Sequence, residues 1–294
     1  MAAGIVVLLL AGCEKEIDIE LKPSNPQLIV EAYINNVLPE YNYVVLSRSQ
    51  DFFAPNFQSI PVKGARVTIT EGELQPSGTI NWDMANKTTM SEANVPNVPV
   101  NFRNGVYFDP RLITSPGLSL RGQPGKYYLL EIDAEGKQYS AVTHLLPPIP
   151  VDSVTSGFPF TDEDGVAKVR ITNHYKDPDT LGNRQLYYWR FRENRDNFGW
   201  GGLNRSRALG RDDLTNGEYI RLTHPQGFAA GDTVNYWMAS VTVDVWNFWD
   251  SFNKVRDNDG PFSTPVSLGS TIKGTDVLGC FSGLSLSGKT VVVR

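Results

Sequence analysis

The sequence predicts an all-β protein with two domains: an N-terminal immunoglobulin-like β-sandwich, then a second β-sandwich or jelly-roll-like domain with one short helix. Short segments in which apolar and polar residues alternate recur along the chain, with Gly, Pro and Asp turns between them. A helical period is evident in one segment only, from Thr242 to about Val255. The length of 294 residues suits about two domains at ~150 residues each.

The N-terminus carries an apolar run, residues 5–10, followed directly by Leu10-Ala11-Gly12-Cys13. This tetrapeptide resembles the bacterial lipobox, whose cysteine is acylated. The run is far shorter than the ~20 residues that span a membrane, and it fits the apolar region of a signal peptide. We therefore expect residues 1–12 to be a lipoprotein signal peptide and Cys13 to carry a lipid anchor. The alternative is a hydrophobic N-terminus that packs against the protein.

Residues 13–26 are a charged, Pro-containing tether, and the first predicted domain covers residues 27–146. Its clearest feature is a β-hairpin around the turn at residues 133–137. The polar stretch 81–104 is predicted to be an excursion from the sandwich. Strands are predicted at residues 28–34, 41–47, 64–70, 105–108, 126–132 and 138–143.

Three prolines within residues 147–150 mark the boundary, because they favour an extended and stiff connector. The predicted linker is 147–151 and the second domain is 152–294. Strands are predicted there at residues 168–172, 186–192, 219–222 and 233–241.

The one predicted helix begins after Thr242, whose hydroxyl can cap it. Apolar residues recur at every third position along it, and we interpret this stripe as core rather than as a ligand site. The stripe consists of Val243, Trp246, Trp249, Phe252 and Val255.

Composition and charge narrow the class of protein. A formal net charge of −5 argues against a nucleic-acid-binding protein, which would carry a basic excess. Hydrophobic residues make up 40% of the chain, which is enough to bury a core. With Cys13 lipidated, Cys280 has no cysteine partner, so no disulfide is expected and Cys280 is expected to be a small buried residue.

Several short motifs follow one another in a defined order. Residues 28–34 (LIVEAYI), 64–67 (GARV) and 136–141 (GKQYSA) are similar to LVVEGYI, GAxV and GKxYxA. Residues 245–251 (VWNFWDS) precede residues 260–266 (GPFSTPV), Ile272, Gly274 and residues 278–283 (LGCFSG). In order and spacing, these motifs resemble a Bacteroidetes lipoprotein family catalogued as domain of unknown function 4249. Thr264 stands where that family has an acidic residue.

This resemblance implies an outer-membrane lipoprotein, since members are lipid-anchored there and their genes often neighbour those of TonB-dependent receptors. It suggests a non-catalytic accessory subunit that caps or assists an outer-membrane β-barrel, either a transporter or an assembly complex. Acidic residues after Cys13 resemble a signal for export to the cell surface. Alternatively, these charges only keep the tether solvated, and no protein recognises them specifically.

No motif of catalytic, metal or cofactor chemistry is evident. His144, His174 and His224 have no second His or Cys at metal-ligand spacing. Neither a Gly-x-Ser-x-Gly nucleophile elbow nor a Gly-rich phosphate loop occurs. The acidic segments 162–165 and 257–260 offer oxygen ligands for calcium, but both lack a full calcium-binding loop, so plain Asp-Gly turns are expected. We predict a protein that is not an enzyme and needs no metal or cofactor.

The candidate partner-binding site is the segment 193–217, predicted to be a long loop. Long loops in compact domains tend to be functional or disordered, and Trp and Arg often anchor protein interfaces. We predict that this loop docks on a barrel protein or its cargo. The alternatives are a mobile surface loop, or a hairpin whose Trp folds back onto the core. The proposed contact residues are Arg195, Phe198, Trp200, Arg205 and Arg207.

Two other classes of function remain open. One is a free-standing surface lipoprotein that binds glycan or peptide on aromatic loops such as residues 52–53 and Trp200. The other is a hydrolase with an unrecognised site. A large apolar patch would favour the accessory subunit, and a concave aromatic platform would favour ligand binding. A pocket with converging perturbed carboxylates or a His would favour the hydrolase.

Overall fold

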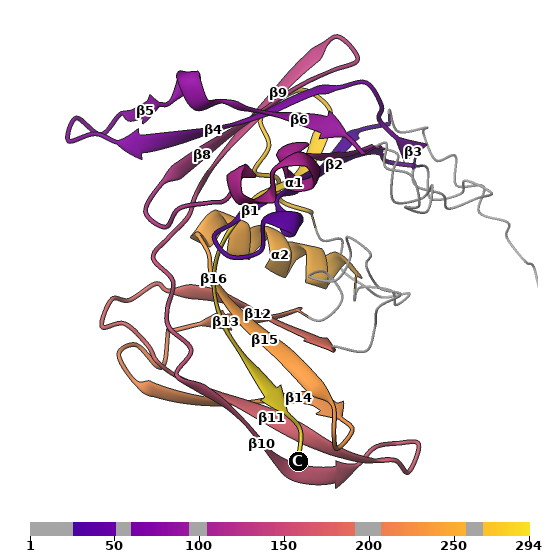
Figure 1. The fold of residues 1–294 in the computed structure, drawn as a ribbon, viewed down its shortest axis with the longest axis vertical. Helices are drawn as coiled ribbons and strands as arrows, with labels where there is room; N and C mark the ends of the chain where they lie inside the picture. Colours follow the sequence, from indigo (N-terminus) through magenta and orange to yellow (C-terminus); the bar gives the residue numbers. More distant parts are fainter. Residues whose placement is uncertain (1–25, 51–59, 94–104, 192–206, 257–266) are drawn as a thin grey trace, which may run out of the picture.

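The computed structural model describes residues 26–50, 60–93, 105–191, 207–256 and 267–294. Strands dominate these residues, which confirms the all-β sandwich fold class. Two lobes are stacked along the long axis, and helix α2 (Val243–Arg256) lies between them (Figure 1). Of the described residues, those within 27–144 and 267–284 form the upper lobe, and those within 152–240 and 285–293 form the lower lobe.

One curved sheet forms the upper lobe, in the order β1-β2-β7-β6-β4-β8-β9. Its far edge curls back to the segment before the last strand, where Ser140 and Lys273 exchange backbone hydrogen bonds of 3.0 and 2.7 Å. Alternate residues, such as Val67 and Ile69, point into an enclosed apolar core. The main strands are β1 (Leu28–Asn35), β2 (Tyr43–Arg48), β4 (Arg66–Leu74), β6 (Thr88–Glu92), β7 (Val106–Phe108), β8 (Tyr127–Ala134) and β9 (Lys137–His144), with β3 (Ile60–Pro61) and β5 (Ile80–Trp82) pairing at the side.

The predicted hairpin is confirmed as β8–β9, and its turn is shorter than expected. Glu135 and Gly136 form it with φ values of 52° and 74°. Two successive left-handed residues are typical of a type I′ turn, whose twist matches that of the paired strands.

The interpretation of residues 81–104 as an excursion is wrong for the part that the structure describes. Residues 80–82 form β5, and residues 88–92 form β6, which pairs with both β4 and β7. Thr88 and Met90 point into the protein and are buried. The sequence pattern did not reveal β6 because the strand contains few apolar residues. Threonine is found at buried strand positions as well as at exposed ones.

The lower lobe is a sandwich of two sheets. The sheet β10 (Ser153–Thr161), β11 (Ala167–Lys176) and β14 (Tyr219–Phe228) packs on the extension β13-β12-β15-β16 of the main sheet. The extension consists of β12 (Arg184–Phe191), β13 (Arg207–Arg211), β15 (Thr233–Ser240) and the end of β16. The four strands predicted in this region are present, while β10, β13 and β16 were not predicted.

Strand β16 (Val277–Val292) belongs to both lobes. Its residues 277–284 pair in parallel with β1, and its residues 285–292 pair antiparallel with β15. Figure 1 shows it running from the upper lobe, behind α2, to the lower lobe. The division into domains at residues 27–146 and 152–294 stays a prediction, and the sheet itself is continuous across it.

The Pro-rich connector is extended and packed against the lower lobe. Leu145, just before the connector, is buried in the core of the upper lobe, whereas Ile149 and Val151 are buried in the core of the lower lobe. The backbone N–H of Ile149 donates to Ser240 Oγ at 3.1 Å, and that of Val151 donates to Ser287 Oγ at 2.8 Å. The connector is therefore held along its length.

Helix α2 confirms the predicted helix and its cap, since the Val245 N–H donates to Thr242 Oγ1 at 3.4 Å. The predicted buried stripe is partly wrong: Val243 and Val255 are 48% and 41% exposed. A step of three residues falls short of a full turn by about 60°, so a strict three-residue repeat winds around the helix. The buried face uses steps of three and four and consists of Val245, Phe248 and Trp249.

Trp249 fixes α2 to the strand that joins the lobes. Its indole N–H donates to Ser282 Oγ at 3.1 Å, and its ring stacks at 6.4 Å from that of Tyr33 on β1. Cys280 beside it is buried, as predicted, and accepts a hydrogen bond from Ser282 Oγ at 3.3 Å.

Candidate functional site

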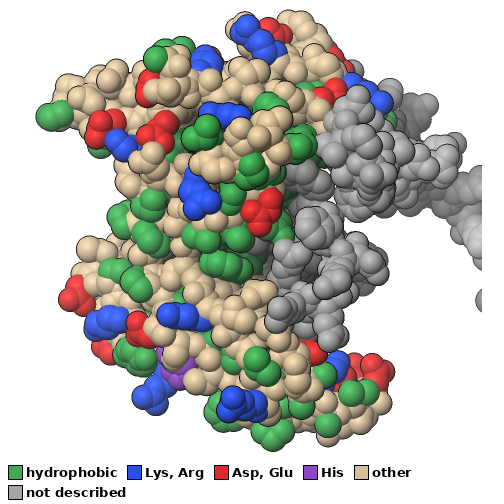
Figure 2. Space-filling view, viewed as in Figure 1, with side chains coloured by type: hydrophobic (Ala, Val, Ile, Leu, Met, Phe, Trp, Pro, Cys, Tyr) green, Lys and Arg blue, Asp and Glu red, His purple; other side chains and the backbone are tan. Residues whose placement is uncertain are grey.

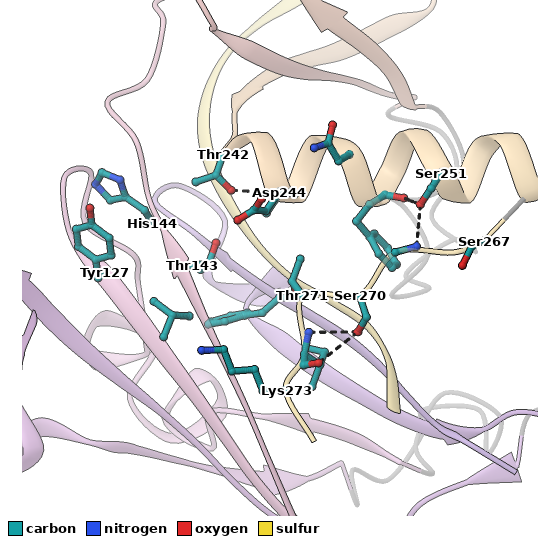
Figure 3. Close-up of a pocket in the computed structure, with 17 residues that line it drawn as sticks. Tyr127, Thr143, His144, Thr242, Asp244, Ser251, Ser267, Ser270, Thr271 and Lys273 are labelled. Atoms are coloured by element: carbon teal, nitrogen blue, oxygen red, sulfur yellow. Dashed lines mark hydrogen bonds between the residues drawn. The ribbon is translucent and has the colours of Figure 1, made fainter. Parts of the chain in front are cut away.

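A cleft of about 920 Å³ lies between α2 and the upper lobe (Figure 3). Its floor is apolar, formed by buried side chains of α2, β16 and the preceding segment. These floor residues are Val245, Phe248, Ile272 and Phe281. The volume lies within the range of small-molecule sites, roughly 300–1,000 Å³.

Backbone and hydroxyl hydrogen bonds fix one wall of the cleft, residues 267–273. Thr271 N–H donates to the Gly279 carbonyl at 2.9 Å, and Thr271 Oγ1 accepts from Phe281 N–H at 3.0 Å. Gly269 N–H donates to Ser251 Oγ of α2 at 3.3 Å. This wall is thus attached to both β16 and the helix, which preorganises the cleft.

An aromatic pair forms the opposite end of the cleft. Tyr127 on β8 and His144 on β9 are directly paired across the hairpin. Their rings are stacked at 4.1 Å between centroids and are nearly parallel, at 2°. Partial burial lowers the pKa of His144 below its ordinary value, while a hydrogen bond involving the Gly125 backbone opposes this. The lowered pKa favours the neutral form of the ring.

Four polar side chains that line the cleft make no hydrogen bond or ion pair with other described residues. In the described parts of the chain, no hydrogen bond or ion pair engages the Tyr127 hydroxyl, the Asp244 carboxylate, the Asn247 amide or the Lys273 ammonium group. In Figure 3, Tyr127 and His144 lie on one side, and Lys273 approaches from the wall opposite α2. The cleft can therefore offer hydrogen-bond donors and acceptors to a ligand.

A second surface feature is the hollow between the lobes. Figure 2 shows hydrophobic side chains gathered around this hollow, over α1 (Arg111–Thr114) and the connector. Ile113 and Leu118 are 58% and 71% exposed, and Pro147 is exposed. We call these three residues, together with the half-buried Leu146, the waist surface.

Asp109 holds the α1 part of the waist surface in place. This buried carboxylate accepts from the backbone N–H groups of Arg111 at 2.9 Å and Leu120 at 2.6 Å, and it pairs with the Arg111 guanidinium at 2.9 Å. The exposed leucine and isoleucine are therefore carried by a fixed segment, which favours binding because little ordering is needed.

The predicted site residues are largely outside the described residues. Cys13 lies there, as do the aromatic residues 52–53 and the segment 257–260. So do four of the five proposed contact residues, Arg195, Phe198, Trp200 and Arg205. Arg207 begins β13, and its backbone pairs with that of Tyr188 on β12. The prediction of one long loop over 193–217 is wrong for residues 207–211, because they extend the sheet.

The remaining candidate ligand groups have structural roles. Asp162 forms the expected turn, accepting from Asp164 N–H at 3.1 Å and Val166 N–H at 2.8 Å. His174 hydrogen-bonds Thr155 at 3.0 Å. Within the described ranges, no three His, Cys, Asp or Glu side chains come together as possible metal ligands.

None of the helices in the described part of the chain has the length and apolar character needed to cross a bilayer.

Sequence reasoning missed the cleft residues Tyr127, Asp244, Asn247 and Lys273. Their types carry no signal alone, and they come from segments far apart in the chain. The available signal was indirect: the motifs at residues 245–251 and 278–283, and Ile272 between them, all contribute residues to the lining of this cleft.

A family model described as Domain of unknown function (DUF4249) matches residues 14–290 of the chain. Neither the comparison with curated proteins nor that with solved structures produced a match.

Proposed function

This chain belongs to the family described as Domain of unknown function (DUF4249), and from that premise we propose that it is a non-catalytic accessory subunit of an outer-membrane β-barrel. In this proposal Cys13 carries the lipid that anchors it to the outer membrane, on the cell surface. The partner is a TonB-dependent transporter or an assembly barrel.

The waist surface is the observation that carries the proposal. Ile113 and Leu118 are mostly exposed, although they lie on a segment fixed by Asp109. Apolar side chains gathered in a hollow are typical of a protein interaction site. A partner loop that enters the hollow would contact both lobes and the connector at once, and a stable interface needs about 800 Å² from each partner.

The test is a pull-down of the tagged full-length protein from native outer membranes in mild detergent, followed by mass spectrometry. We expect one barrel protein to co-purify in stoichiometric amount. The double variant Ile113→Asp/Leu118→Asp should lose it, because two carboxylates would have to be buried in the interface without partners. Both positions are exposed, so the fold should be unaffected.

Leu214→Asp is the matched control. Leu214 is 97% exposed on a loop of the lower lobe, so this variant adds a charge outside the waist surface and should retain the barrel. The proposal is wrong if no barrel protein accompanies the wild-type chain. Equal retention by the double variant would instead contradict the placement of the interface.

A second candidate function, ligand capture by a surface lipoprotein, is favoured by the cleft of Figure 3. Its stacked Tyr127–His144 pair and unengaged polar groups are suited to non-covalent binding. This function is compatible with a barrel partner, since the waist surface and the cleft use different residues.

A further inference from the structure

We infer that the cleft between α2 and the upper lobe is a binding site for a neutral saccharide. This inference deepens the ligand-capture function and does not depend on the barrel partner.

The first reason is the aromatic end of the cleft. A sugar ring has one face of C–H groups, which pack on the electron-rich face of an aromatic ring, and a rim of hydroxyls. Tyr127 and His144 are stacked face to face with an interplanar angle of 2°, so each ring supports the other and the outward ring face of the stack is a flat, rigid platform. Because the two residues are paired in register on β8 and β9, the platform exists before a ligand arrives.

The second reason is the chemistry of the remaining lining. Sugar hydroxyls both donate and accept hydrogen bonds, so their site needs donors and acceptors side by side. Asn247 provides both, Asp244 accepts, and Lys273 donates. None of these three side chains is engaged by another group in the described residues. Ser267 adds a further hydroxyl at the rim.

The third reason is charge. Among the described residues that line the cleft, Asp244 is the one carboxylate and Lys273 is the one ammonium group, and the lowered pKa of His144 favours its neutral ring at pH 7. These described lining residues therefore have no net charge together. A phosphorylated or acidic ligand would need an excess of basic groups, so the lining suits an uncharged ligand.

The apolar floor also fits this ligand class. Phe248 and Ile272 form part of it. A saccharide buries C–H groups as well as hydroxyls, so a site with an apolar floor and polar walls matches both kinds of surface.

The experiment uses the purified full-length protein in detergent, without any barrel. A glycan array of neutral and acidic oligosaccharides identifies binders, and calorimetry with the best neutral oligosaccharide gives the dissociation constant. Tripeptide mixtures are titrated in parallel. We expect binding of at least one neutral oligosaccharide and none of the peptides.

Two variants test whether the saccharide binds in the cleft. Tyr127→Ala removes one of the two stacked rings and should weaken the affinity at least 10-fold. Asn247→Ala, at an exposed position of α2 where the fold tolerates change, should weaken it about 5-fold or more, as expected from a lost hydrogen bond of ~1 kcal/mol. Tyr219→Ala is the control, since Tyr219 is a 49% exposed tyrosine on β14 of the lower lobe, and it should bind like the wild type.

Three results would overturn the inference: no neutral oligosaccharide binds, only peptides or acidic glycans bind, or both cleft variants bind as tightly as the control. The barrel proposal is unaffected by any of them, because the array contains no membrane protein and the cleft variants leave the waist surface unchanged.

Discussion

Replacing Gly279 with alanine should destabilise the protein by about 4 kcal/mol or more. Gly279 lies in β16 with φ +144°, a conformation that L side chains rarely adopt. A Cβ at this position would overlap the backbone oxygen of Val30 on β1. The two strands pair here in register, so the clash falls on backbone that cannot rotate away. Urea unfolding followed by circular dichroism measures the loss.

The matched control is Gly157→Ala. Gly157 lies in strand β10, its φ is not positive, and a Cβ there would meet no atom within 4 Å. It should unfold within about 1 kcal/mol of the wild type, since Gly157 is only partly buried and the added methyl group would overlap no other atom. Equal midpoints for the two variants would show that β1 and β16 do not approach each other as closely as the structure has them.

Acidification should destabilise the lower lobe through His224. This ring is 1% exposed among Tyr187, Trp189 and Tyr236, and burial lowers its pKa from 6.5 to about 4. Its Nε2 has no hydrogen-bond partner in the described residues. The folded protein holds the ring neutral, whereas the unfolded chain binds a proton there below pH 6.5. The folded state is therefore not penalised above pH 6.5, and its free energy of unfolding decreases as the pH falls from 6.5 to 4. The loss between pH 7.5 and pH 4 should be about 3 kcal/mol.

The variant His224→Phe isolates this effect, because it keeps an aromatic ring and removes the titration. Its free energy of unfolding should fall by about 3 kcal/mol less than that of the wild type over the same pH range. His174→Asn, in which His224 is intact, should keep the wild-type loss. A His224→Phe protein that is as sensitive to acid as the wild type would contradict the burial of a neutral His224.

The parts of the fold that could be predicted are those encoded locally. Strict alternation at Val67 and Ile69 predicts β4 and its buried face, and the Glu135-Gly136 pair predicts the β8–β9 hairpin. Thr242 before an apolar repeat predicts α2. In each case the residues that determine the element are neighbours in the sequence, so a local pattern is enough to predict it.

What could not be predicted depends on distant partners. No strand was predicted at residues 277–292, and nothing local in the sequence says that the two halves of β16 pair with β1 and β15. The cleft requires β8, β9, α2 and residues 267–273 to meet, and only the topology brings Tyr127, Asn247 and Lys273 to one place. The predicted contact residues Phe198 and Trp200 lie outside the described residues, so their role as a docking site stays a proposal.

The dual membership of β16 has a consequence for biosynthesis. Leu28 pairs with Val277, so β1 is synthesised long before the strand that becomes its neighbour. Until that strand arrives, β1 has an unpaired edge, and an exposed edge is a template for association with other chains. Contacts between such distant residues also slow folding. We expect the nascent chain to remain incompletely folded until residues 277–292 have been synthesised, and a ribosome-stalled chain that lacks these residues to be cut readily by proteases in both lobes.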